Sequence, residues 1–350
     1  QTILDHRMSR RGFIAKTTSG AMALAFAASV TGCSDDDSNP EPNPSNPSET
    51  PTGPVDEHAW SDSKSRPSKL SFEPVKKNTQ NFFSVPEGYQ LKVLYAVGDP
   101  INPAYEEKKD AELPSGASYQ FRAGDNHDGM SFFGMDPIAK KYAAKESKQG
   151  LLVLNHEYLQ QSQLHTPMGV ITNPDGTRPE DQVLREVNAH GVSVIEITKD
   201  DATQEVKINL NSEFNRRITA ATEMDIRGPA QGSDMVKTKF SPDGLRTRGT
   251  FANCGNGYTP WGTYLTAEEN WSGYFSRQAN DVREIAKEEV SLSRYGRGGM
   301  GARSSQYKWD TPLAELTGQI DLYERWDISI KAENALQDFR NSLNTCGFIV

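Results

Sequence analysis

The stretch GLLVLNHEY at residues 150–158 decides how the fold is interpreted. Residues 151–154 form a short, wholly apolar run, which is typical of a strand buried on both faces. Asn155, His156 and Glu157 follow directly, so we expect them at the rim of the sheet that contains this strand. Polar groups held rigidly at a sheet's rim frequently bind metals or take part in catalysis. The stretch therefore predicts a buried strand that ends in candidate functional residues.

Glu157 and Asn155 are candidate metal ligands, although they do not belong to a zinc motif. A His-Glu-x-x-His sequence would need a second histidine where Gln160 stands. The carboxylate of Glu157 and the amide carbonyl of Asn155 are oxygen ligands of the kind that calcium and iron accept. The alternative is that His156 and Glu157 only hydrogen-bond the backbone and have a structural role.

Short strands separated by turns continue on both sides of this stretch. Residues 89–95 and 191–197 alternate apolar and polar side chains, and residues 205–210 are expected to pair with the second of these segments. Residues 173–176 and 241–244 carry proline and glycine at turn positions. This pattern predicts an all-β fold, which would be a sandwich, a barrel or a propeller. No clean internal repeat chooses among the three.

The composition of the chain excludes some classes of protein. Its 350 residues suit one large domain or two modest ones. Helical stretches are expected to be scattered, with one at residues 279–290 as a surface insertion. The formal net charge of −9 argues against a nucleic-acid-binding protein, which would usually present a basic face. Cys33, Cys254 and Cys346 are too widely spaced for a disulfide framework or a zinc-binding cysteine pair.

The amino terminus has the features of an export signal. Residues 9–16 read SRRGFIAK, with the paired Arg10 and Arg11 of a twin-arginine signal, and an uncharged, alanine-rich stretch follows. Residues 30–33 resemble a lipobox, in which the peptide is cut before Cys33 and the cysteine is acylated. Residues 1–33 are therefore predicted to be a lipoprotein signal peptide. The alternatives are a chance arginine pair, and an incidental cysteine near an ordinary cleavage site.

The next segment has the composition of a solvated tether. Residues 34–57 contain seven acidic residues and no basic one, with repeated Pro, Ser and Asn. Such a sequence cannot bury enough apolar surface to fold, so residues 34–66 are predicted to be a disordered linker. The folded part is expected at residues 67–350. Because the chain starts with Gln and its last five residues resemble the opening of a buried strand, we expect it to be a fragment of a longer protein.

Residues 253–270 hold the densest set of chemically useful side chains. Cys254 lies among small flexible residues, and Glu268 and Glu269 follow a short strand expected at residues 263–266. Neighbouring residues on a strand point to opposite faces, so the two carboxylates cannot face one point without a bulge or a turn. One of them would bind a metal while the other orients it. The alternative is a solvated loop.

Two further motifs give weaker signals. Asp128 lies in a calcium-loop-like segment, residues 125–130, but the EF-hand register fails because Gly124 and Met135 fall at its first and last positions. On its own this segment is expected to be a turn. Residues 296–301 satisfy the Gly-x-Gly-x-x-Gly pattern but follow no predicted strand, so they are expected to form a flexible loop rather than a dinucleotide site.

Four segments together resemble the PhoX-type alkaline phosphatases. They are NHEY at 155–158, HGVSV at 190–194, NRRIT at 215–219, and the block at 253–269 with its TPWGTYL core. The resemblance runs in order from about Phe82 to Val350. It implies a β-propeller whose central site holds a mixed cluster of calcium and iron and hydrolyses phosphate monoesters. The twin-arginine signal agrees with it, because this family is typically exported folded.

The resemblance also implies roles for individual residues. Glu157 and one of Glu268 or Glu269 would bind metal, Asn155 and Asp128 are further candidates, and Cys254 would be an iron thiolate or else a small buried cysteine. A phosphate-clamping arginine and additional ligands are expected beyond residue 350. Residues 67–350 would then form an incomplete set of blades that is inactive alone. For Arg216 and Arg217 a structural ion pair is favoured over a phosphate contact.

Together with the export signal, the resemblance implies an exported, metal-dependent alkaline phosphatase that acts on small phosphorylated substrates. It would use the twin-arginine export machinery, be held to a membrane through Cys33, and function in the periplasm or at the cell surface. Its acidic charge implies that bound cations attract the anionic substrate. Two alternatives remain: a lipid-anchored propeller that binds ligands without catalysis, and a propeller hydrolase for another ester.

Overall fold

The computed structural model describes residues 72–80, 82–106, 113–299 and 301–350. The predicted signal peptide and most of the linker, including Arg10, Arg11 and Cys33, lie outside these residues. The contacts divide the chain into two units, Gln1–Lys76 and Lys77–Val350, and all of the helices and strands named below belong to the second.

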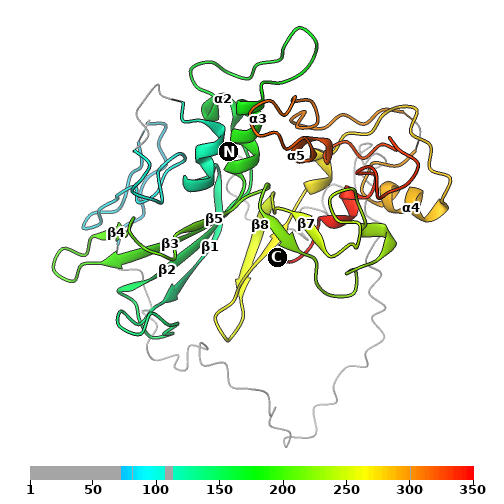
Figure 1. The fold of residues 1–350 in the computed structure, drawn as a ribbon. Helices are drawn as coiled ribbons and strands as arrows, with labels where there is room; N and C mark the ends of the chain where they lie inside the picture. The colour runs from blue at the N-terminus through cyan, green and yellow to red at the C-terminus, as the bar shows by residue number, and fades with distance from the viewer. Residues whose placement is uncertain (1–71, 81, 107–112, 300) are drawn as a thin grey trace, which may run out of the picture. The chain divides into compact units, whose positions relative to one another are not determined.

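The largest element is a five-stranded antiparallel sheet (Figure 1). Its strands follow the order β1-β2-β3-β4, and β5 also pairs with β3. The strands are β1 (His127–Gly134), β2 (Gln149–His156), β3 (Gly191–Lys199), β4 (Val206–Ile208) and β5 (Arg216–Ile218). The strands predicted at 151–154 and 191–197, and the pairing of the latter with 205–210, are confirmed.

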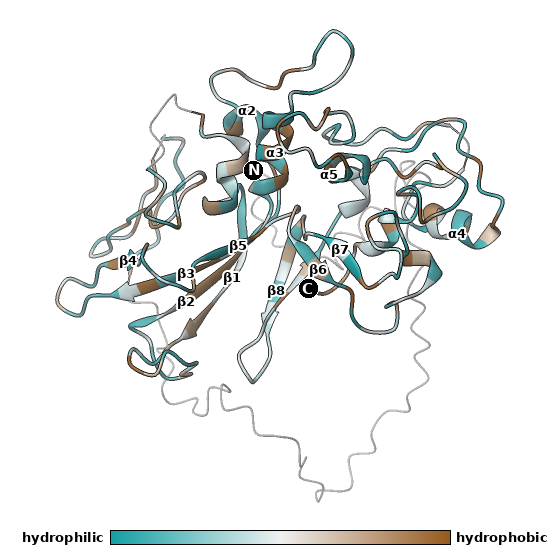
Figure 2. Cartoon of the chain, viewed as in Figure 1, coloured by the Kyte–Doolittle hydropathy of each residue, from teal (hydrophilic) through white to brown (hydrophobic). Residues whose placement is uncertain are grey.

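Strands β2 and β3 form because they are rich in apolar side chains, most of which are buried. Figure 2 shows the apolar residues along both strands. On one face, Leu154 packs with Tyr95 and Ile195. On the other, Val153 packs with Val194. Since successive side chains of a strand point to opposite sides, an uninterrupted apolar run serves two cores.

Two separate hairpins follow the large sheet in sequence. They are β6 (Glu223–Asp225) with β7 (Arg246–Arg248), and β8 (Asn253–Tyr258) with β9 (Tyr264–Glu268). The strands of the described residues therefore form three antiparallel sheets, and these do not close into a barrel or a propeller. An all-β architecture with little helix is confirmed in this coarse form.

The helices are short. They are α2 (Gln161–Leu164), α3 (Glu180–Ala189), α4 (Ala286–Arg294) and α5 (Asp321–Glu324), with 3₁₀ turns η2 (Gly116–Phe121), η3 (Asp234–Val236), η4 (Trp271–Tyr274) and η5 (Ser342–Thr345). The helix predicted at 279–290 begins later, at Ala286, and α3 was not predicted. In the part of the chain that is described, no helix has the length and apolarity needed to span a membrane.

Helix α3 is fixed by a buried carboxylate, Glu186. Its oxygens accept hydrogen bonds from Arg178 at 2.7 and 2.8 Å and from the Trp309 indole at 2.7 Å, and His165 Nε2 lies 2.6 Å away. Burial alone would raise the pKa of Glu186, but the bonds from His165, Arg178 and Trp309 and the charge of Arg178 together lower it to about 2. A fully satisfied buried carboxylate of this kind specifies how α3 packs.

Arg217 on β5 holds the other end of α3. Its guanidinium is buried and donates to the carbonyl oxygens of Asn188 at 3.1 Å and of His190 at 2.6 Å, which lie at the carboxyl end of the helix. It also donates to the carbonyls of Tyr119, Arg122 and Val192. The last carbonyls of a helix have no partner within it and attract cations. Arg217 therefore joins α3, η2 and β3.

Three predictions about local structure are corrected. Residues 89–95 are irregular, with Leu91 and Val93 exposed, because alternation alone supplies no neighbouring strand to pair with. The segment 125–130, expected to be a turn, enters β1 at His127. The ion pair expected for Arg217 is also wrong, since its partners are carbonyl oxygens and no described carboxylate pairs with it.

The turn and loop predictions agree with the structure. The amides of Gly176 and Gly244 donate to the carbonyls of Asn173 and Ser241, and both glycines have positive φ angles of 88° and 69°. The described residues of the segment 296–301 lie in a loop after α4 and follow no strand. That placement removes the structural context that a dinucleotide-binding motif needs.

Candidate metal centre

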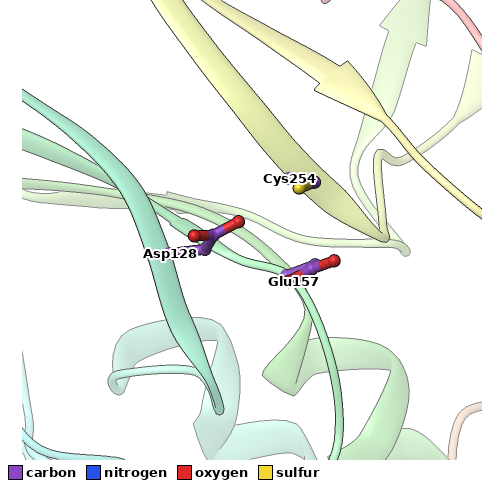
Figure 3. Close-up of side chains that lie close together, drawn as sticks. All are labelled: Asp128, Glu157 and Cys254. Atoms are coloured by element: carbon purple, nitrogen blue, oxygen red, sulfur yellow. The ribbon is translucent and has the colours of Figure 1, made fainter. Parts of the chain in front are cut away.

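Asp128, Glu157 and Cys254 come together from three different parts of the chain (Figure 3). One carboxylate oxygen of each acid and the thiol sulfur all lie within 4.8 Å of one another. Asp128 is on β1, Glu157 follows the last residue of β2, and Cys254 is on β8. Asp128 is exposed and the other two are half-buried, so the group is open to solvent.

Asp128 owes its direction to a β-bulge in the large sheet. His127 pairs with His156 and Met130 pairs with Leu154, so two residues of β1, Asp128 and Gly129, lie opposite one residue of β2. A bulge interrupts the regular alternation of side chains and re-aims them, and it is frequent beside active sites.

Cys254 lies in a second bulge of the same kind. Asn253 pairs with Glu268 and Asn256 pairs with Thr266, which leaves Cys254 and Gly255 opposite a single residue of β9. Each of these two candidate ligands is thus an inserted residue followed by glycine. The geometry of the cluster depends on both insertions.

Glu157 is placed by the end of β2 and has a perturbed carboxyl group. Its amide donates to the carbonyl of Asn126 at 3.1 Å, which turns the chain towards the start of β1. Burial, followed by the negative charges of Asp128 and Glu269, raises the pKa of Glu157. Crowded carboxylates of this kind favour either protonation or a bound cation.

The thiol of Cys254 is affected in the same way. Its hydrogen bond to Glu269, burial and the neighbouring Asp128 raise the pKa of Cys254 to about 12. Without a cation the thiol is therefore held in its neutral form at physiological pH. A metal ion bound here would lower the pKa of Cys254, because the cation stabilises the thiolate and neutralises the charge of the carboxylates.

The structure separates the two adjacent glutamates. Glu269 is hydrogen-bonded to the thiol of Cys254, and its negative charge raises the pKa of Glu157. Glu268 is turned away, and its carboxylate accepts hydrogen bonds from Thr250 at 2.9 Å and from the backbone amide of Gly347 at 2.6 Å. Burial raises the pKa of Glu268. Glu269 is thus the member of the pair that reaches the cluster.

Asn155 lies beside the cluster and is fully buried. Its Nδ2 donates to the carbonyls of Cys254 and Gly255 at 2.9 and 3.3 Å, and its Oδ1 accepts from the Tyr264 hydroxyl at 2.9 Å. Both ends of the amide are therefore engaged by protein groups. No motif in the sequence indicates a role for Tyr264, although this residue lies in the 253–270 block.

The donor set fits the metals that the sequence suggested. Asp128, Glu157 and Glu269 supply hard carboxylate oxygens, which calcium and trivalent iron accept, and the thiolate of Cys254 is an iron ligand rather than a calcium ligand. The neighbouring carboxylates raise the pKa of both Glu157 and Cys254, which indicates uncompensated negative potential at this point. Both observations are as expected for a cation-binding site.

A polar pocket begins at Tyr158, the residue after Glu157. Its volume is about 770 Å³. None of its lining side chains is charged; they are Tyr158, Leu159, Gln160, Gln161, Ser162, Thr166, Pro167, Gly169, Val170, Gln306 and Tyr307. The pocket can offer hydrogen bonds from amide and hydroxyl groups to an uncharged ligand.

Comparison with known proteins gives a consistent result. Residues 70–350 match the family described as alkaline phosphatase PhoX. A similar solved structure is "Pseudomonas fluorescens PhoX in complex with vanadate, a transition state analogue", with a TM-score of 0.59 and 29% sequence identity. The similarity covers 80% of this chain but 41% of that one, so the chain spans about two fifths of the length of this relative. No curated protein matches the chain.

Proposed function

The chain belongs to the PhoX alkaline phosphatase family, and we propose that its full-length protein is a metal-dependent hydrolase of phosphate monoesters. The observation that carries this proposal is the convergence of Asp128, Glu157 and Cys254 within 4.8 Å, with Glu269 beside them. The relative from Pseudomonas fluorescens binds vanadate, a mimic of the transition state. A related site in this protein would bind the transition state of phosphate ester hydrolysis.

We assign the metals by ligand chemistry. Cys254 and the carboxylates nearest to it would hold iron, and the remaining carboxylate oxygens would hold calcium. When bound, these cations would neutralise the charge of the phosphoryl oxygens and act as Lewis acids. The protein's own contribution is to hold Asp128, Glu157 and Glu269 in fixed directions at the ends of its strands.

The surroundings of the cluster support a small phosphorylated substrate. With a formal net charge of −9, the chain repels a phosphate group unless cations are present. The uncharged pocket that starts at Tyr158 would receive the organic part of the ester through hydrogen bonds. We also propose that the three antiparallel sheets are blades of a β-propeller that the full-length protein completes.

The test is a phosphatase assay on the full-length protein. We expect it to hydrolyse p-nitrophenyl phosphate and glycerol phosphate, to lose activity in a chelator, and to regain it when iron and calcium are returned. Because the pocket is uncharged, glycerol phosphate is expected to be preferred over a phosphorylated carboxylic acid.

Three results would contradict parts of the proposal. Full activity in the chelator would exclude the metal mechanism. A metal-loaded protein without turnover of any phosphate monoester would point instead to a ligand-binding protein, or to a hydrolase of a lactone or a phosphodiester. Preference for the charged substrate would exclude the proposed use of the pocket.

We further propose that the protein is exported through the twin-arginine system and lipidated at Cys33. The support is the sequence SRRGFIAK at residues 9–16 and the lipobox-like residues 30–33. The protein would then function in the periplasm or at the cell surface. Cells fed labelled palmitate are expected to label the wild-type protein but not Cys33→Ala, and equal labelling of both would exclude the anchor.

A further inference from the structure

The two sheets that supply the candidate ligands are joined by side chains and not by a common ladder. In the described part of the chain, no backbone hydrogen bond connects β1 or β2 with β8. The contact is nevertheless close: a Cβ atom on Gly129 would lie 2.6 Å from the Asn256 side chain, and Asn256 donates to Ser131 at 2.9 Å. The separation of Asp128 and Cys254 therefore depends on side-chain hydrogen bonds.

Asn155 serves the bulge that carries Cys254. A bulge leaves its extra residue outside the regular ladder, so the carbonyls there need another donor. Nδ2 of Asn155 provides it for both bulged residues, at 2.9 Å to Cys254 and 3.3 Å to Gly255. Asn155 is on β2, and Glu157 directly follows the end of this strand. The contact therefore fixes the β8–β9 hairpin to the strand that positions Glu157.

Tyr264 connects the same asparagine to the other bulge. Its hydroxyl lies 2.9 Å from Oδ1 of Asn155 and 3.0 Å from the carbonyl oxygen of Gly129. The single hydroxyl proton can be donated to either acceptor. Gly129 follows Asp128 in the first bulge. The hydroxyl of Tyr264 and the side-chain amide of Asn155 therefore connect the backbone beside Asp128, Glu157 and Cys254.

We infer that Asn155 and Tyr264 are positioning residues that hold the two bulges at the separation required by the metal. Neither is needed as a ligand in this arrangement, because their polar atoms are bonded to the protein. Partners of this kind, one shell away from the ion, typically change metal affinity 10–100-fold when they are removed. The inference rests on the proposed metal site.

Tyr258 offers a matched control for Tyr264. The two tyrosines pair across the β8–β9 hairpin. Both rings meet Phe133 edge-on, with ring centroids 5.9 and 6.3 Å away. Of the two hydroxyls, only that of Tyr264 reaches Gly129 and Asn155. The variants Tyr258→Phe and Tyr264→Phe therefore delete the same atom from neighbouring rings and differ in the proposed bonds.

The experiment measures metal binding by the full-length protein. Metal-stripped protein is titrated with Co²⁺, and the thiolate-to-cobalt charge-transfer absorption reports the thiolate of Cys254; a Cys254→Ser variant identifies this band. We expect Tyr264→Phe to weaken Co²⁺ binding by about 10–100-fold and Tyr258→Phe to leave it unchanged. Thermal unfolding of the metal-free variants is measured in parallel; both phenylalanine variants are expected to unfold cooperatively, with Tyr264→Phe at a slightly lower Tm because it loses a partly buried hydrogen bond.

A second variant keeps the test independent of Tyr264. Asn155→Leu is close in size to asparagine and adds no charge, but it removes the donors to Cys254 and Gly255, so it is also expected to weaken Co²⁺ binding. The inference is overturned if Tyr264→Phe binds Co²⁺ like the wild type, if both tyrosine variants are weakened equally, or if the wild type binds none.

The experiment distinguishes failure of the positioning role from failure of the proposed phosphatase activity. A protein whose Co²⁺ affinity falls in Tyr264→Phe alone, but which hydrolyses no phosphate monoester, would contradict the proposed activity and support the positioning role. An active phosphatase with unchanged Co²⁺ affinity in Tyr264→Phe would do the opposite.

Discussion

Replacing Glu157 by alanine in the full-length protein is expected to lower kcat/KM for phosphate monoesters by at least about a thousandfold. Glu157 lies within 4.8 Å of Asp128 and Cys254, and burial together with the charges of Asp128 and Glu269 raises its pKa. Losing it would weaken cation binding and the stabilisation of the phosphoryl group. Metal ions contribute several kcal/mol to transition states of this type, and about 1.4 kcal/mol corresponds to a tenfold change in rate. Steady-state kinetics with p-nitrophenyl phosphate measures the change.

Glu213→Ala is the control for this experiment. Glu213 is also a glutamate, but it is exposed and lies outside the cluster. We expect it to retain wild-type kinetics. If Glu157→Ala retained wild-type kcat/KM and metal content, the assignment of the metal centre to this cluster would be wrong.

The second large effect concerns stability. Arg217→Met is expected to lower the free energy of unfolding by about 4 kcal/mol or more, because each buried carbonyl that loses a donor costs about 1–3 kcal/mol. The guanidinium of Arg217 donates to five such carbonyls, including the last ones of α3. Burial lowers the pKa of Arg217 to about 10, so it remains charged at neutral pH. Urea unfolding followed by circular dichroism measures the loss.

The neighbouring Arg216 separates this effect from a general effect of charge. Arg216 is exposed and donates to the carbonyl of Phe214. Arg216→Met removes the same charge and is expected to change stability by less than about 0.5 kcal/mol. Equal losses in the two variants would show that the buried carbonyl contacts of Arg217 contribute little.

The sequence predicted those parts of the fold whose structure follows from their own local pattern of apolar and polar residues. The apolar run at 151–154 is typical of a buried strand, and on that prediction Glu157 lies at the rim of the sheet, as the structure shows. Glu268 and Glu269 do point in different directions, as expected for neighbours on a strand. Alternation along the strand could not identify which of them faces the metal, because that depends on the hairpin's neighbours.

The parts that were missed depend on partners distant in sequence. Helix α3 buries Arg185 and Glu186, so its pattern looks polar although its position is internal. Asp128 lies in a segment rich in turn residues, and only its pairing with β2 shows that it belongs to a strand. A bulge is a mismatch between two strands, so neither Asp128 nor Cys254 could be oriented from one strand alone.

The two bulges make the centre sensitive to chain length as well as to residue identity. Each contains one residue more than its partner strand, at Asp128–Gly129 and at Cys254–Gly255. Loss of the codon for Gly129 or for Gly255 would restore the regular ladder and re-aim the ligand before it, Asp128 or Cys254. Every ligand residue would still be encoded, yet the ligands would no longer converge. A one-residue gap at these positions therefore marks a relative that has lost the metal centre while keeping all of its residues.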